Sequence, residues 1–232
     1  MSNKGPKIVL ESHHPASRKA TTFFPSTVKP AATVERILKS GHNSRKIGDK
    51  VGKGKWRGIP IFTLTLEERD TCPRSCLEWT TCYGNNMPFA HRIHDDGTLT
   101  KRIWAELAAL NAAHPAGFLV RLHVLGDFYS IAYVEFWRLA LVEFRALRIF
   151  GFTARKASEP IGMAILRTLV EHQDRFWMRF SGGGYETHCS EVVERPEDVS
   201  GVRCPAETDA ARCCATCALC WTSDRTISFV RH

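Results

Sequence analysis

The run Phe118-Leu-Val-Arg-Leu-His-Val-Leu125 is followed by an amphipathic stretch, Ile131 to Phe144, and by a second apolar run, Leu147-Arg-Ile-Phe-Gly-Phe-Thr153. Short runs rich in β-branched and aromatic residues predict strands, and apolar residues at helical spacing predict a helix between them. A strand, helix and strand of these lengths imply a crossover between two parallel strands.

The same alternation extends in both directions along the chain. Strands are predicted at 59–66, 175–181 and 226–232, and helices at 100–113 and 160–172. At least four strands with helices between them predict an α/β fold, an open, partial β/α barrel of parallel strands. We expect three parts: a basic, partly disordered N-terminal arm (1–40), the partial barrel (41–184), and a cysteine-rich, loop-rich C-terminal segment that binds a cluster (185–232).

Composition restricts the class of protein. The 232 residues are 44% hydrophobic, enough for a packed core, and contain no run of about 18 apolar residues and no signal-peptide pattern. We therefore expect a cytoplasmic protein whose thiols stay reduced. In that compartment the nine cysteines are more typical of metal-binding or catalytic sites than of disulfides.

The positive charge is confined to one end of the chain. The formal net charge is +8, and residues 1–57 hold +10 of it, which leaves −2 for the remainder. A basic arm of this kind is predicted to contact DNA or RNA phosphates, and the alternative is a solubilising tail. Within it, Trp56 is expected either to stack on a base or to pack on the domain.

The second of two cysteine groups has the spacing of an iron–sulfur ligand set. The predicted ligands of one [4Fe–4S] cluster are Cys204, Cys214, Cys217 and Cys220. The C-x2-C-x2-C run is typical of ferredoxin-type ligation, and the distant Cys204-Pro205 completes it. The neighbouring Cys213 could replace Cys214 by a change of register. Zinc is the alternative metal.

The first cysteine group follows directly after the predicted strand 59–66. Its members are Cys72, Cys76 and Cys82. Three thiolates can hold three irons of a second [4Fe–4S] cluster and leave the fourth iron open, or form a zinc site completed by His91 or His94. Two further alternatives are that both groups share a single cluster, or that these three side chains are small buried residues.

Polar residues also follow the predicted strands. Gly126, Asp127, Arg155 and Ser181, with Gly182 to Gly184, all lie at predicted strand ends. Ligands of parallel α/β folds bind at the carboxyl ends of the strands, so these residues are predicted to bind a cofactor beside the first cysteine group. Ordinary turn and capping chemistry is the alternative. Arg121 and His123 are expected to share one face of their strand.

These motifs resemble those of the phage gene product 88 family of mobile-element proteins. The resemblance rests on Asn43 to Gly48, Trp56 to Leu64, Thr71 to Tyr83, Arg121 to Phe128 and Cys204 to Trp221. It covers roughly residues 40–225, and it implies more about architecture than about activity.

More distantly, the layout is similar to that of radical S-adenosylmethionine proteins. That resemblance implies a partial barrel, a cluster loop after the first strand, auxiliary clusters, and Gly126-Asp127 near the methionine amino group. The last cysteine gap here is five residues rather than two, and Tyr83 follows Cys82. The resulting hypothesis is a [4Fe–4S] protein with redox or radical chemistry; the alternative is a zinc-stabilised nucleic-acid-binding protein of a mobile element.

Overall fold

The structure, a computed structural model, describes residues 7–182 and 188–231. The strands are β1 (Val28–Pro30), β2 (Lys39–Ser40), β3 (Ile61–Thr63), β4 (Arg92–His94), β5 (Phe118–Leu122), β6 (Leu147–Thr153), β7 (Phe176–Ser181), β8 (Cys189–Val193), β9 (Val202–Arg203) and β10 (Ile227–Val230). The α-helices are α1 (Pro15–Lys19), α2 (Glu68–Thr71), α3 (Leu99–Ala113), α4 (Ile131–Glu143), α5 (Pro160–Glu171) and α6 (Cys214–Cys217).

Eight of these strands form one open sheet in the order β2-β3-β5-β6-β7-β8-β10-β9. Every neighbouring pair is parallel except β2 with β3. The prediction of an open, mostly parallel sheet followed by a cysteine-rich segment is therefore confirmed. β1 and β4 form a separate parallel pair.

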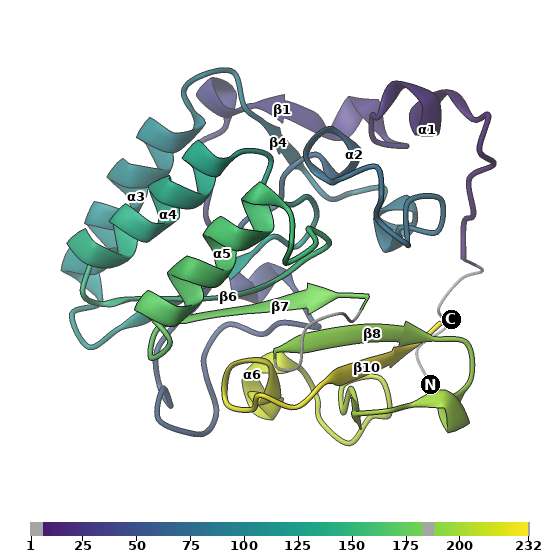
Figure 1. Cartoon of the computed structure of the whole chain (residues 1–232). Coiled ribbons are helices and arrows are strands. Elements are labelled where there is room, and N and C mark those ends of the chain that lie inside the picture. Colours follow the sequence, from purple (N-terminus) through teal and green to yellow (C-terminus); the bar gives the residue numbers. More distant parts are fainter. Residues whose placement is uncertain (1–6, 183–187, 232) are drawn as a thin grey trace.

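Helices α3, α4 and α5 cover one face of the sheet (Figure 1). The strands advance across the sheet in one direction from β3 to β7, so right-handed crossovers place all three helices on the same side. Leu107, Trp137 and Ile165 from these helices are fully buried against the strands. None of the described helices is long and apolar enough to cross a membrane.

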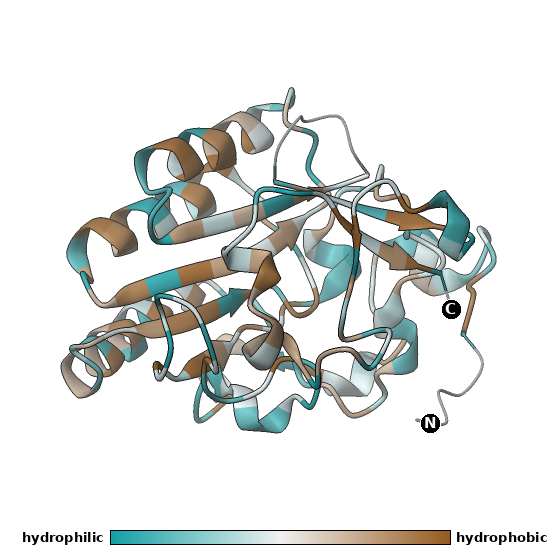
Figure 2. Ribbon diagram, turned by 90° about the horizontal axis from the view of Figure 1, so that it is seen from below, coloured by the Kyte–Doolittle hydropathy of each residue, from teal (hydrophilic) through white to brown (hydrophobic). Residues whose placement is uncertain are grey.

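The opposite face is covered by the loop 47–59 and by the C-terminal segment 204–221. A second core joins Trp56 and Trp221 to Phe150 of β6. The two indole rings stack with centroids 6.4 Å apart and planes 15° apart. Burial on both faces explains why the central strands are mostly apolar (Figure 2). Of the two interpretations of Trp56, packing on the domain is the one the structure favours.

The N-terminal arm differs from the expectation of a partly disordered segment, because from Lys7 onward it packs on the body. The Thr22 backbone N–H donates to Glu67 Oε1 at 2.9 Å, and its hydroxyl donates to Glu68 Oε1 at 2.8 Å. The Leu10 N–H donates to the carbonyl oxygen of Thr80. Buried carboxylates need hydrogen-bond donors, and the arm supplies them. Residues 1–6 lie outside the described residues.

Candidate metal centres

The C-terminal cysteine set lines a single small pocket on the face of the sheet opposite the helices. All four predicted ligands are in its wall: Cys204, Cys214, Cys217 and Cys220. The first follows β9, the next two lie in α6, and the last lies in the 3-10 turn Leu219–Trp221. The rest of the wall is apolar, formed by Pro205, Ala206, Ala218, Leu219 and Ile227. The pocket therefore presents thiols and no other polar side chain.

The structure distinguishes Cys214 from its neighbour Cys213. Cys213 caps α6, with its sulfur 3.7 Å from Thr216 Oγ1 and its N–H donating to the same oxygen at 3.2 Å. Its sulfur faces Gly48, where an added Cβ would lie only 2.9 Å away. Cys213 is therefore absent from the pocket wall, and Cys214 takes that place.

Three of the pocket thiols, those of Cys204, Cys214 and Cys220, have pKa values raised by burial, which favours the neutral form. Burial raises the pKa of Cys220 to about 11 and raises that of Cys214 well above its ordinary value. A bound metal ion displaces the thiol protons, because the thiolate is the metal ligand. Loading this site would therefore place several new negative charges in a desolvated pocket.

Two arginines from the sheet are close enough to the pocket to interact with those negative charges. Charge interactions link Arg121 of β5 to Cys214 and Cys220, and link Arg179 of β7 to Cys220. Neither arginine has a salt bridge to a carboxylate among the described residues. Asp224 acts on Arg179 only through a longer-range charge interaction. A buried cation without a direct ion pair is costly, so thiolates bound to a metal would improve the charge balance. The donor set fits a metal or cluster on this ground.

The two arginines are bound in different ways. Arg179 is fully buried, and its guanidinium donates to the backbone carbonyl oxygens of Cys189, Leu219, Ser223 and Arg225. Its Nε has no hydrogen-bond partner in the described part of the chain. Arg121 instead lies over the rings of Phe150 and Phe152, 5.4 and 4.8 Å from their centroids.

The first cysteine set lies in the loop that follows α2. The three thiols interact electrostatically with one another, and burial raises the pKa of all three, that of Cys82 to about 11. None of the three lines the C-terminal pocket. The first cysteine set therefore does not contribute to the wall of that pocket.

Two buried arginines hold the backbone of this loop. Arg69 donates to the carbonyl oxygen of Trp79 and to Asn85 Oδ1, the latter at 2.6 Å. Arg92 pairs with Glu68 at 2.7 Å and donates to the carbonyl oxygens of Gly84, Met87 and Ala90. These hydrogen bonds from buried arginines therefore fix the loop conformation, and they do not involve the cysteine side chains.

The strand-end residues converge on Thr71, which immediately precedes Cys72. The Asp127 N–H donates to Thr71 Oγ1 at 3.1 Å, and the Arg155 guanidinium donates to the Thr71 carbonyl oxygen at 2.7 Å. Gly126 has φ +87°, and a Cβ there would lie 2.7 Å from Thr71 Oγ1. These three predicted cofactor residues thus position the first cysteine.

Both oxygens of the Asp127 carboxylate accept hydrogen bonds. It accepts from the Thr153 hydroxyl at 2.8 Å and from the N–H groups of Ala154 and Phe128, each at 2.7 Å. Burial raises its pKa to about 6, despite these hydrogen bonds. The carboxylate therefore ties the ends of β5 and β6 together beneath the cysteine loop.

The end of β7 reaches the same loop. A Cβ on Gly182 would lie 3.0 Å from a methyl carbon of Leu77, and Ser181 Oγ lies 3.3 Å from Ser190 Oγ. Ser181 is thus at the same mouth as the first cysteine set. Gly183 and Gly184 lie outside the described residues.

Arg121 and His123 do not share a face, so that prediction is wrong. β5 ends at Leu122, and the His123 ring lies on the helix side, with Nε2 3.3 Å from the Tyr133 hydroxyl. Burial lowers the pKa of His123 to about 3, which keeps it neutral. Of the two, Arg121 belongs with the C-terminal cysteines.

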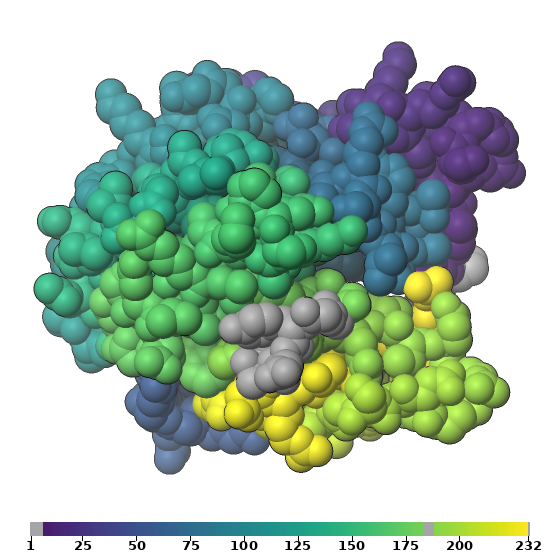
Figure 3. All heavy atoms as spheres, in the orientation of Figure 1, coloured from purple at the N-terminus to yellow at the C-terminus, as the bar shows by residue number. Residues whose placement is uncertain are grey.

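The two cysteine-bearing segments meet at an ion pair. Arg231 in the C-terminal segment contacts Glu78 of the first loop at 2.5 Å. Figure 3 shows the first loop, in blue, directly above the yellow-green C-terminal segment. Among the described residues, no three cysteine sulfurs all lie within 4.8 Å of one another.

Sequence reasoning missed Arg179. A charged residue in the apolar run Phe176–Ser181 was the available signal, since strands buried on both faces are near-continuously apolar. Comparison of the chain with protein-family models, curated proteins and solved structures finds no match. The resemblance to the gene product 88 family therefore stays a prediction.

Proposed function

We propose that this chain is an iron–sulfur protein whose C-terminal cysteines ligate a [4Fe–4S] cluster. One observation carries the proposal: Cys204, Cys214, Cys217 and Cys220 line one pocket, near two arginines that form no salt bridge with a carboxylate in the described part of the chain. A cluster with four thiolate ligands has a net negative charge, which Arg121 and Arg179 would balance. Such a cluster supplies one-electron transfer when it is bound.

The sulfur spacing favours a cluster over a single zinc ion. Metal–sulfur bonds of about 2.3 Å in a tetrahedron place sulfurs about 3.8 Å apart. No three of the described cysteine sulfurs all lie within 4.8 Å of one another. The described cysteines therefore do not form a preformed site for one zinc ion.

The first set is proposed to hold a second cluster with an open iron. Cys72, Cys76 and Cys82 offer three thiols, and they lie at the carboxyl ends of β3 and β5. An open iron binds a ligand such as S-adenosylmethionine, and the enzyme proposal depends on that property. Gly126, Asp127, Arg155 and Ser181 would then hold the cluster loop in place.

Anaerobic purification followed by iron and sulfide analysis tests the cluster proposal. We expect iron and acid-labile sulfide in equal amounts, near four or eight per chain for one or two [4Fe–4S] clusters. A colourless protein with stoichiometric zinc would show that the cysteines are zinc ligands.

The enzyme proposal has a separate test. Adding S-adenosylmethionine to the reduced protein should change the electron paramagnetic resonance spectrum of the cluster at Cys72, Cys76 and Cys82. Cys76→Ser should remove the responsive signal and leave the C-terminal cluster signal. An unchanged spectrum at saturating ligand would limit the function to electron transfer or structure.

Binding of DNA or RNA is the second candidate function. Lys53, Lys55 and Arg57 are exposed on the loop around the buried Trp56, so this loop offers positive charge without a ring for base stacking. Changing all three cations to Gln removes the positive charge and retains the Trp56 side chain, although it also removes the Lys55 ammonium from above the Trp56 ring. Salt-dependent binding of an oligonucleotide that the triple variant loses would support this function, and equal binding by both proteins would exclude this loop.

A further inference from the structure

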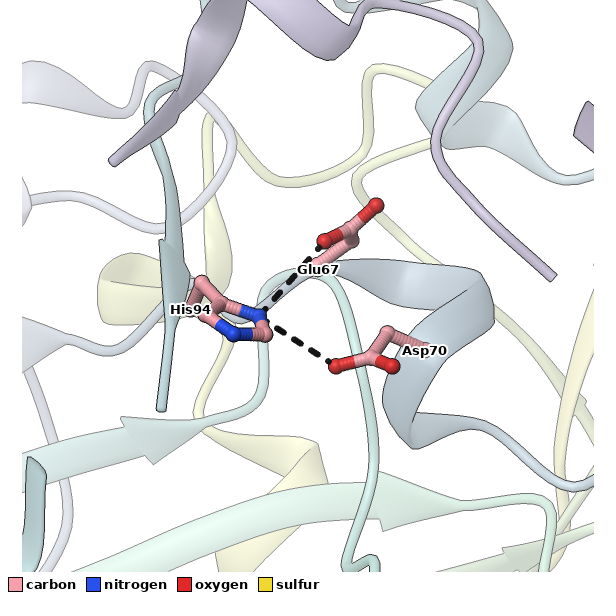
Figure 4. Close-up of side chains that lie close together, drawn as sticks. All are labelled: Glu67, Asp70 and His94. Carbon is pink, nitrogen blue, oxygen red and sulfur yellow. Dashed lines mark ion pairs between the residues drawn. The ribbon is translucent and has the colours of Figure 1, made fainter. Parts of the chain in front are cut away.

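A cluster of metal-ligating side chains lies outside both cysteine sites, between α2 and β4. Glu67 precedes α2, Asp70 lies in it, and His94 ends β4; Figure 4 shows the three side chains converging. His94 Nδ1 is 3.5 Å from Asp70 Oδ2 and 3.9 Å from Glu67 Oε2. In the described residues, this is the one group of three such ligand atoms within 4.8 Å of one another.

The burial of the Glu67 carboxylate and its few hydrogen-bond partners are a second observation that points to a cation. Its side chain is only 9% exposed, yet its Oε2, which faces His94, accepts no hydrogen bond in the described structure. The other oxygen, Oε1, accepts from the Thr22 N–H at 2.9 Å. The arginines that could neutralise it are engaged elsewhere, Arg92 with Glu68 and Arg69 with the cysteine loop. The Glu67 carboxylate therefore has one hydrogen-bond donor and, at 3.9 Å, the half-exposed His94 ring as its ion-pair partner, and a cation between them would stabilise its charge in this largely buried position.

We propose that Glu67, Asp70 and His94 bind one divalent first-row transition-metal ion. A tetrahedral ion with bonds of about 2.1 Å to nitrogen and oxygen places ligand atoms about 3.4 Å apart, close to the observed spacing. One imidazole and two carboxylates suit Mn²⁺, Fe²⁺ or Zn²⁺ rather than a thiolate-seeking ion. The Thr22 N–H orients Glu67 in the manner of an outer-shell partner.

The location gives the site two consequences. Asp70 and His94 are 49% and 46% exposed, so an ion held by three protein ligands keeps positions for water or for an anionic oxygen ligand. The ion would also join three segments: the arm through Thr22, α2 through Asp70 and β4 through His94. The site is independent of the cluster proposal.

Titration with Mn²⁺ alone tests the inference, because this hard ion avoids thiolates. Binding removes the six-line electron paramagnetic resonance signal of the free ion. We expect one site per chain in the full-length protein, and at least tenfold weaker binding in His94→Ala and in Glu67→Gln, which keeps the acceptor for Thr22. His91→Ala, an exposed histidine three residues away, is the matched control and should bind as the wild type does.

Two results would overturn the proposal. One is the absence of Mn²⁺ binding by the wild type at millimolar concentration, and the other is equal binding by wild type and His94→Ala. If Glu67→Gln fails to fold, the His94→Ala result decides alone, since that half-exposed side chain is not part of the core.

Discussion

The two cysteine sites offer the same ligand atoms in opposite electrostatic surroundings. Arg121 interacts with Cys214 and Cys220, and Arg179 interacts with Cys220. Asp127 and Glu68 interact with Cys72, and a cation, Arg69, acts on the first set through Cys76 and Cys82. Positive charge stabilises the reduced, more negative state of a cluster, and carboxylates favour the oxidised state. We therefore expect two clusters in this fold to have different reduction potentials, with the higher potential at the C-terminal site.

The sites also differ in completeness. The C-terminal pocket has four thiols and an otherwise apolar wall, and the stacked Trp56 and Trp221 belong to the same apolar cluster as Cys214 and Cys220. The first set has three thiols in a loop whose Leu77 and Tyr83 are 77% and 52% exposed. A site with a complete set of four ligands suits storage or transfer of electrons, and a site with three ligands leaves a position for binding of a further ligand.

The largest expected effect comes from removing a C-terminal ligand. Cys220→Ser should lose about half of the iron of a two-cluster protein, or all of it if only this cluster forms, together with several kcal/mol of stability, because metal binding adds directly to folding free energy. Iron analysis and thermal unfolding of the anaerobically purified variant measure both effects.

Cys213→Ser is the matched control for that variant, since its sulfur caps α6 outside the pocket. It should retain its iron and lose at most about 1 kcal/mol, the ordinary contribution of a helix cap. If Cys213→Ser loses iron and Cys220→Ser does not, the assignment of ligands is wrong.

The next effect concerns the aromatic packing in the apolar cluster beside the C-terminal site. Trp56→Ala removes one of the two stacked rings, and a buried Trp truncation typically costs about 3–5 kcal/mol. Urea unfolding should show this loss. Phe89→Ala, on the first loop and 92% exposed, should stay within about 0.5 kcal/mol of the wild type. Equal effects of the two variants would contradict the described packing.

A pH effect should appear at the first site. Burial raises the pKa of Asp127 to about 6 from 3.8, so the native state binds the proton more tightly than the unfolded state does. Protonation of Asp127 therefore contributes at most about 3 kcal/mol to the free energy of unfolding. This contribution is fully present below about pH 4 and is lost as the pH rises through 6. The stability difference between wild type and Asp127→Asn, measured by urea unfolding from pH 4 to 7, should fall accordingly. A difference that is constant with pH would refute this.

The smallest effect tests the electrostatic contrast itself. Arg121→Met retains an apolar side chain beside Phe150 and Phe152 but removes one positive charge near the C-terminal thiols. The reduction potential of that cluster should fall by about 50 mV, equivalent to about 1 kcal/mol for one electron. Redox titration followed by electron paramagnetic resonance measures it. A rise in potential would show that the contrast has been assigned in the wrong direction.

Local sequence patterns predicted the central part of the fold. β6 has the predicted bounds, and α3, α4 and α5 begin and end within one residue of them. Strong apolar periodicity fixes such elements locally. The pattern did not reveal β8, whose run Cys189-Ser-Glu-Val-Val is short and half polar, nor the position of β10 between β8 and β9. Strand order depends on contacts between distant segments, which periodicity does not record.

The candidate sites were predictable to a similar extent. Spacing singled out the four cysteines that share a pocket, because C-x2-C-x2-C brings thiols together over one short helix and turn. It could not choose between Cys213 and Cys214, since that choice depends on the close approach of Gly48. The group Glu67, Asp70 and His94 was missed because His94 lies 24 positions after Asp70 in the chain. The three side chains come together only because β4 packs beside the start of α2.

The insertion of β10 between β8 and β9 has a consequence for the order of assembly. β9 has no strand to pair with until β10 has arrived, although β9 is made first. Cys204 follows β9, and Cys220 lies shortly before β10, so the pocket takes shape only when this late insertion is finished. A cluster bound there would stabilise the completed sheet. The availability of iron would then determine what fraction of the newly made chain reaches its native form.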